Sequence, residues 1–99
     1  MKYKKTDNIC GTYLRGHITV SYEDLVSVFG KQHSIGDGYK TSCEWALEFQ
    51  DGTVATIYDW KQNKEYLGEE GIHYSKVHEW NVGGNRIEAV EYVNNHIGE

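Results

Sequence analysis

Two runs of alternating residues on either side of Asp51-Gly52 constrain the fold more than any other feature of the sequence. CEWALEFQ precedes this dipeptide and TVATIYDW follows it. Asp-Gly between alternating runs is the pattern of a β-hairpin with a two-residue type I′ turn. The chain is therefore predicted to contain an antiparallel hairpin over residues 43–60.

The length of this turn sets the register of the hairpin. With two turn residues, Phe49 opposes Val54 on a predicted core face. The remaining members of that face are Cys43, Trp45, Leu47, Thr56, Tyr58 and Trp60. The other face brings Glu44 across from Asp59, and two carboxylates across a ladder destabilise it unless they are screened. Three alternatives remain open for this pair: a solvated edge, a salt bridge within the chain, or a metal or partner site.

Before the hairpin, the sequence predicts a strand and a helix. Residues 17–20, HITV, alternate as a short strand does. Ser21 is a suitable N-cap, and Asp24 three residues later makes an approximate capping box. Gly30 is the predicted end of this helix, and residues 31–42, with Gly-Asp-Gly at 36–38, are predicted as a loop.

After the hairpin, a second strand and helix are predicted. The strand covers residues 77–82, VHEWNV, and Gly83-Gly84 ends it. Asn85 is the predicted N-cap of the C-terminal helix, and Glu88 completes another capping-box pattern. The first backbone N–H groups of such a helix have no partner within the helix. They donate hydrogen bonds either to the side chains of Asn85 and Glu88 or to an external anion.

These elements predict one α+β domain over residues 1–99. The expected architecture is a small, mainly antiparallel sheet, centred on the Asp-Gly hairpin, with two helices packed on one face. Residues 1–10 are expected to form a mobile arm. At 99 residues there is room for a single core.

The charge is unevenly distributed along the chain. Residues 1–43 carry six Lys or Arg against four Asp or Glu (net +2), and residues 44–99 carry four against eleven (net −7), which gives the overall −5. An acidic protein lacks the cations that bind phosphate backbones, so direct nucleic-acid binding is not expected. The asymmetry favours self-association into a homo-oligomer or an acidic face for a basic partner.

The sequence gives no signal of a membrane span, a disulfide framework or a metal site. Cys10 and Cys43 have no CxxC spacing, and the five histidines are scattered. No catalytic motif with a nucleophile, a phosphate loop or a metal-binding histidine pair is present. We therefore expect a cytoplasmic protein that is not an enzyme and has no cofactor.

A nucleotide pocket is the sharpest site hypothesis that the residues allow. Backbone N–H groups at Gly83, Gly84 and Asn85, together with Arg86, would hold a phosphate. The rings that could stack on a base are Trp60, Tyr66 and Trp80. Plain core packing is the alternative for each of these rings.

Four segments, SYEDLVSVFG, EWALEFQDGTVATIYDWK, YLGEEG and EWNVGGN, resemble a group of small bacteriophage-encoded accessory proteins. The resemblance covers residues from about 17 to 97, and its most specific pieces are ATIYDWK and the Trp-x-Val-Gly-Gly step. It implies a protein made in the bacterial host cytoplasm. It also implies a role in countering host defence, either by sequestering a nucleotide immune signal or by blocking a defence complex such as a CRISPR effector.

Two binding mechanisms follow from this resemblance and the residues together. In the first, the protein sequesters a cyclic or ADP-ribose-like nucleotide in the predicted pocket without cleaving it. In the second, acidic residues occupy a basic groove of a host defence protein. The residues expected to do so are Glu44, Asp59, Glu65, Glu69, Glu70 and Glu79.

Overall fold

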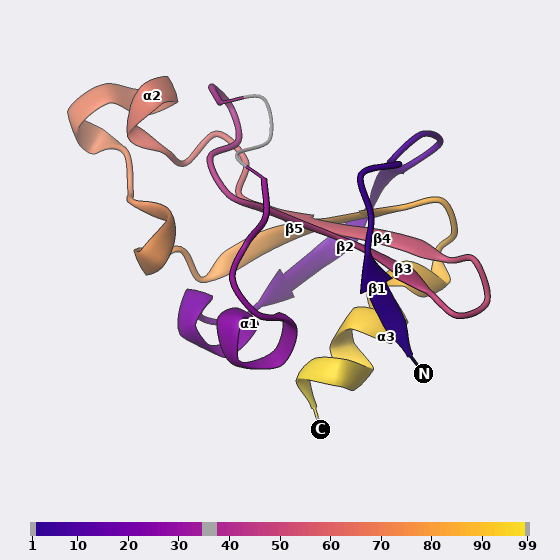
Figure 1. Ribbon diagram of the computed structural model, residues 1–99. Helices are drawn as coiled ribbons and strands as arrows, with labels where there is room; N and C mark the ends of the chain where they lie inside the picture. Colours follow the sequence, from indigo (N-terminus) through magenta and orange to yellow (C-terminus); the bar gives the residue numbers. More distant parts are fainter. Residues whose placement is uncertain (1, 35–37, 99) are drawn as a thin grey trace.

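The computed structural model describes residues 2–34 and 38–98, whose strands form one sheet in the order β1-β3-β4-β5-β2 with antiparallel neighbours (Figure 1). The strands are β1 (Tyr3–Lys5), β2 (Tyr13–Thr19), β3 (Glu44–Phe49), β4 (Val54–Tyr58) and β5 (Glu79–Gly84). The helices are α1 (Tyr22–Phe29), α2 (Lys64–Leu67) and α3 (Glu88–Ile97), with short 3-10 turns η1 (Gly68–Glu70) and η2 (Tyr74–Lys76). Gly36 and Asp37 of the predicted loop lie outside the described residues.

Helices α1 and α3 pack on the same face of the sheet, so the predicted α+β arrangement is confirmed (Figure 1). Leu25 and Phe29 of α1 and Ala89 and Val93 of α3 are buried against the sheet. The sheet contributes Ile18, Trp45, Leu47, Phe49, Ala55, Ile57, Trp80 and Val82 to this core. The opposite face, called here the open face, is covered by neither of these two helices (Figure 1).

Helix α1 begins and ends as the sequence predicts. Ser21 Oγ accepts a hydrogen bond from Asp24 N at 3.1 Å, which is the N-cap geometry. Gly30, at φ 82°, ends the helix and donates its N–H to Val26 O at 2.8 Å. The strand before this helix is longer than the predicted 17–20, because β2 begins at Tyr13.

The hairpin is present, but its predicted register is wrong by one residue. Phe49 pairs with Thr53, donating its N–H to Thr53 O at 2.7 Å, and not with Val54. The turn therefore has three residues, and Gly52 takes φ 90° at its end. A three-residue loop that closes with a left-handed glycine is the next most common hairpin after the two-residue turn.

This one-residue shift turns every side chain of β4 to the other face of the sheet. Ala55 and Ile57 pair with Leu47 and Trp45 and join the core. Val54, Thr56 and Tyr58, which the sequence predicts on the core face, lie instead on the open face with Glu44. Asp59 does not oppose Glu44, so the predicted carboxylate pair does not form.

The predicted helix start at Gly83-Gly84 is also wrong, because both glycines belong to β5. A Cβ at Gly83 would lie 2.5 Å from Thr56 Oγ1, and one at Gly84 would overlap Ala89 Cβ. Close packing therefore requires these glycines. Helix α3 begins only at Glu88, and its N-cap residue makes no side-chain cap hydrogen bond.

Asn85 acts as an extension of the sheet and not as a helix cap. Its Oδ1 accepts from Val54 N at 2.8 Å, and its own N–H donates to Val54 O at 3.2 Å. Its Nδ2 donates to Gly52 O at 3.1 Å. The amide side chain thus ties the end of β5 to the hairpin turn.

The N-terminal residues differ from the predicted arm, since β1 pairs with β3 at one edge of the sheet. Tyr3 packs edge-to-face on Phe29 and His96, and its hydroxyl donates to Val28 O at 3.2 Å. Because β2 lies at the opposite edge, residues 6–12 cross the sheet between the two strands (Figure 1). We call these residues the crossing segment.

Candidate functional site

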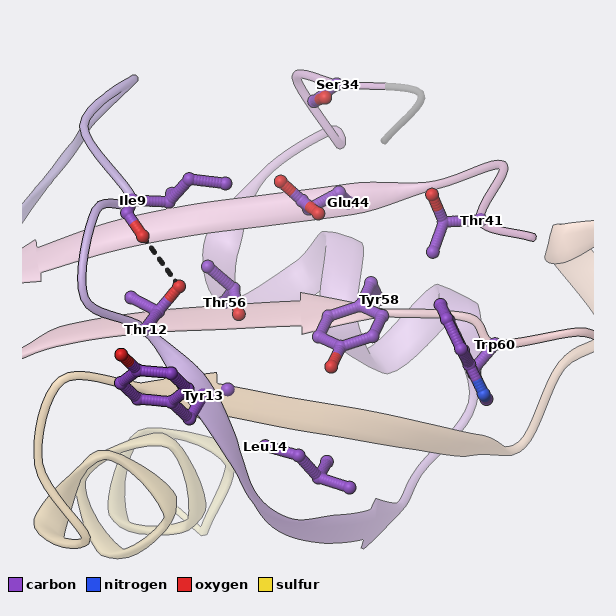
Figure 2. Close-up of a pocket in the computed structure, with 11 residues that line it drawn as sticks. Ile9, Thr12, Tyr13, Leu14, Ser34, Thr41, Glu44, Thr56, Tyr58 and Trp60 are labelled. Atoms are coloured by element: carbon purple, nitrogen blue, oxygen red, sulfur yellow. Dashed lines mark hydrogen bonds between the residues drawn. The ribbon is translucent and has the colours of Figure 1, made fainter. Parts of the chain in front are cut away.

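The open face carries a cavity of ≈ 490 Å³ (Figure 2). The crossing segment and the start of β2 form one wall, and the ends of the hairpin strands form the other. The principal lining residues are Ile9, Tyr13 and Leu14 on the first wall, Glu44, Tyr58 and Trp60 on the second, and Thr56 with Gly83 at the floor.

Large apolar side chains line this cavity without being covered. Tyr13 is 69% exposed, Leu14 is 53% exposed, and Ile9 and Trp60 are each 40% exposed. Exposed apolar groups that gather around one concavity indicate a binding surface, whereas scattered ones do not.

The floor of the cavity depends on Gly83. Gly83 pairs with Thr56 across β4 and β5, and a side chain at this position would meet the Thr56 hydroxyl. The absence of a Cβ therefore keeps the backbone within reach of whatever enters. Tyr58 lies farther along the same face, and burial raises the pKa of its hydroxyl, which remains a hydrogen-bond donor at neutral pH.

Two lysines lie over the exposed tryptophan at one end of the cavity. Lys40 Nζ is 5.9 Å and Lys61 Nζ is 5.5 Å from the centre of the Trp60 ring. Lys61 Nζ also lies 5.8 Å from the Tyr66 ring, which packs edge-to-face on Tyr39. We call these five residues the lysine–aromatic cluster. Sequence reasoning singled out Trp60 and Tyr66 but missed both lysines.

The backbone holds Lys61 in an unusual conformation. Its φ is 56°, and it is the one non-glycine residue with positive φ among those that the structure describes. Its N–H donates to Lys40 O at 2.7 Å, which brings the two lysines together. A left-handed lysine is strained by roughly 1–2 kcal/mol, and strained residues are common in binding sites.

The other predicted nucleotide-binding residues do not join this cluster. Trp80 is fully buried and donates its Nε1–H to Val20 O at 3.0 Å, so it belongs to the core. Gly84 pairs with Ala55, near the hairpin turn. Since Trp60 is five residues farther along the chain, roughly 17 Å of extended strand separates it from the Gly84–Arg86 end. Gly84 therefore lies at the opposite end of β4 from Trp60, whereas Gly83 lines the same cavity as Trp60.

The acidic residues predicted to meet a partner also divide into separate groups. Asp59 is fully buried, where its carboxylate accepts hydrogen bonds from Ser42 N, Ser42 Oγ and Cys43 N. It closes the open end of the hairpin and is unavailable to a partner. Glu44 lines the open-face cavity. The exposed members of the set are Glu65, Glu69, Glu70 and Glu79.

Burial shifts the pKa of two reactive side chains, Cys43 and His33. Burial, followed by the nearby Asp59 and Glu44, raises the pKa of the Cys43 thiol to about 12, so it is protonated at neutral pH. His33 accepts a hydrogen bond from Ala46 N, and burial lowers its pKa. Among residues 2–34 and 38–98, no group of three His, Cys, Asp or Glu could hold a metal ion.

Comparison of the sequence with known protein families and with curated proteins finds no match in either. Over the part of the chain that the structure describes, no helix is both long and apolar enough to cross a membrane.

Proposed function

We propose that the protein binds a small nucleotide-derived anion in the open-face cavity and sequesters it without cleaving it. The observation that carries the proposal is the pair of ammonium groups of Lys40 and Lys61 over the exposed ring of Trp60. A nucleotide presents a flat base and a negatively charged phosphate, which are the two chemistries that this cluster can recognise.

Each part of the ligand has a counterpart in the site. Base stacking on an aromatic side chain contributes about 1–3 kcal/mol per base. Lysine ammonium groups bind phosphate as point charges. The Tyr58 hydroxyl on one wall and the backbone at Gly83 on the floor add polar groups, which can select among ligands of similar size.

The sequence resemblance to bacteriophage accessory proteins supports a biological role for such binding. In an infected cell, a nucleotide that activates host defence would be removed from solution by a protein that binds it tightly and does not turn it over. We therefore propose a counter-defence role, in the bacterial cytoplasm, for this chain.

Calorimetric titration with cyclic dinucleotides and ADP-ribose-type nucleotides tests this proposal. We expect Trp60→Ala to weaken binding roughly 5- to 150-fold, the equivalent of one stacked base. Lys61→Gln should also weaken it. Arg86→Gln is the matched control, because it removes one cation at the other end of β4 and should leave affinity unchanged. If Arg86→Gln alone abolishes binding, the ligand binds beside Gly83 and Gly84 and not at Trp60.

Native mass spectrometry of protein from cells with an activated nucleotide defence should detect the bound nucleotide. A protein that carries no ligand and binds none of the nucleotides in the titration would refute the proposal.

The second candidate function is an acidic inhibitor of a basic protein groove. Glu65, Glu69 and Glu70 favour it, because they are exposed on the α2–η1 segment, which projects from the sheet (Figure 1). Charge reversal at Glu69 and Glu70 should then abolish inhibition and leave nucleotide binding intact. If this variant also loses nucleotide binding, the two functions do not use separate surfaces.

A further inference from the structure

The side chain of His33 completes the edge of β3 at a point where two other segments meet it. At the start of the crossing segment, Thr6 N–H donates to Ala46 O at 3.1 Å. Two residues away on β3, Glu44 forms a bridge with Ser34 and donates its N–H to Ser34 O at 2.9 Å. Between these contacts, Ala46 N–H donates to His33 Nε2 at 2.9 Å. An imidazole therefore takes the place of a backbone carbonyl here.

This hydrogen bond fixes the protonation state of the ring. Because Nε2 accepts from Ala46 N–H, the single proton of the neutral imidazole is assigned to Nδ1. Nδ1 is buried and has no hydrogen-bond partner among the described residues. An imidazolium would carry a proton on Nε2 as well, and this proton would face the Ala46 N–H. Protonation of His33 therefore requires its bond to Ala46 to break.

The groups around the ring also act on its protonation. Burial has the largest effect and lowers the pKa of His33, Lys5 at the end of β1 lowers it further, and Asp7 in the crossing segment acts in the opposite direction. On β3, Glu44 lines the open-face cavity, and Lys31, in the same segment as His33, is exposed. Because the pKa lies below the ordinary 6.5 of histidine, the ring is neutral at pH 7.

The contacts beside this ring support one wall of the open-face cavity. Ser34, the residue after the imidazole, lines that cavity, and so does Ile9 of the crossing segment (Figure 2). The two segments are attached to β3 next to each other, at Glu44 and Ala46. Loss of the side-chain bond to Ala46 therefore loosens the place at which both are held.

We propose that neutral His33 is a pH-sensitive latch, which holds these two segments against the edge of β3 and releases them in acid. The latch is at full strength above about pH 6.5, where neither its closed nor its open form is protonated. It weakens as the pH falls below this value, because the open form takes up a proton that the closed form excludes. The expected effect on ligand affinity rests on the proposed nucleotide function, whereas the latch itself does not.

Hydrogen exchange of the Ala46 amide, followed by NMR of the full chain, tests the latch without any ligand. From about pH 7.5 to about pH 5, the protection of this amide, corrected for the intrinsic exchange rate, should fall by up to roughly 30-fold. This is the limit for an open form with the ordinary pKa of 6.5 and a closed form that excludes the proton. His33→Gln keeps an acceptor for Ala46 N–H and cannot titrate, so the fall should disappear. His78→Gln, the same change at an exposed histidine, should retain it.

Ring ¹⁵N chemical shifts of the wild-type protein give a second measurement, which decides the outcome even if His33→Gln fails to fold. At about pH 7.5 they should show a proton on Nδ1 of His33 and none on Nε2. A proton on Nε2 at this pH would overturn the proposal. Protection of the Ala46 amide that does not change with pH, or that falls equally in His33→Gln, would also overturn it.

Calorimetric titration with a cyclic dinucleotide at the same two pH values tests the effect on the cavity, because the phosphodiester groups stay ionised at both. Affinity should fall in acid for the wild-type protein and stay constant for His33→Gln. If the dinucleotide binds at neither pH, the proposed function fails, and hydrogen exchange alone then decides whether the latch exists. Equal affinity at both pH values, with the exchange effect present, would show that the latch does not control the cavity.

Discussion

Asn85 and Val54 exchange two hydrogen bonds, one through the Asn85 backbone N–H and one through its side-chain Oδ1. The side chain thereby serves as a further backbone unit of β5 at the point where the chain leaves the sheet. This contact explains why an asparagine follows the two glycines although no helix begins there.

Asn85→Ala should lower the free energy of unfolding by about 1–3 kcal/mol, because it leaves the N–H of Val54 without an acceptor in a buried position. Urea denaturation measures this change. Asn85→Asp keeps the oxygen and should lose less. Equal losses in the two variants would mean that the Nδ2 bond to Gly52 dominates.

Gly84→Ala should destabilise the protein by about 1–3 kcal/mol through overlap with the Ala89 methyl group. Ala89→Gly alone should cost about 1 kcal/mol because glycine is a poor helix residue. The double variant should be more stable than the sum of the two losses predicts. Strict additivity in urea denaturation would contradict the contact.

Lys61→Gly should separate stability from ligand binding. Glycine relieves the strain at φ 56° but loses more backbone entropy on folding, so the free energy of unfolding should change by less than about 1 kcal/mol. Nucleotide affinity should fall because the ammonium group over Trp60 is gone. Thermal melting and calorimetric titration of one preparation measure both effects, and retained affinity would exclude Lys61 from the site.

The Asp51 carboxylate should give the protein a pH dependence in acid. The Tyr92 hydroxyl donates to Asp51 Oδ2 at 2.6 Å, and this bond, followed by the one from the Thr53 N–H, lowers the pKa of Asp51 from 3.8 to about 2. A depressed carboxyl pKa stabilises the folded state above about pH 4, and that contribution disappears as the pH falls towards 2.

Tyr92→Phe should therefore raise the pKa of Asp51 towards its ordinary value and reduce the slope of stability against pH in this range. NMR titration of the Asp51 carboxyl carbon, with unfolding curves at several pH values, measures both. Tyr13→Phe, at the exposed tyrosine of β2, is the control and should leave the Asp51 pKa unchanged. A shift of similar size in the control would assign the effect to something other than the hydrogen bond.

Iodoacetamide at mildly alkaline pH should label Cys10 and spare Cys43 in the native protein. Cys10 is exposed, whereas Cys43 is fully buried and its pKa is raised to about 12. Mass spectrometry should detect a single adduct until denaturant is added, when a second appears. Rapid double labelling without denaturant would indicate that the open end of the hairpin separates readily.

The local features of this fold could be predicted from the sequence, and the features that depend on pairing could not. The cap at Ser21 and the end of α1 at Gly30 rest on neighbouring residues and are confirmed. The hairpin register is different, because alternating runs fit a two-residue and a three-residue turn equally well. Only packing against α1 and α3 selects Ala55 and Ile57 for the core.

The same distinction holds for the candidate site. The chemistry of Trp60, Tyr66 and Gly83 marks them in the sequence, and the structure has Trp60 and Gly83 lining one cavity with Tyr66 beside it. Arg86 is predicted from a helix that begins after Asn85, whereas α3 begins at Glu88. The contributions of Ile9 and Lys40 come from segments distant in sequence, and no local pattern marks them.

The crossing segment has a consequence for synthesis of the chain. Strands β1 and β2 are made first, but their partners β3 and β5 follow much later, at residues 44–49 and 79–84. On the ribosome, β1 therefore stays unpaired until residues 44–49 have emerged, and β2 stays unpaired until residues 79–84 have emerged. Because the crossing segment between them also walls the open-face cavity, we expect the cavity to form only after β5 has paired with β2.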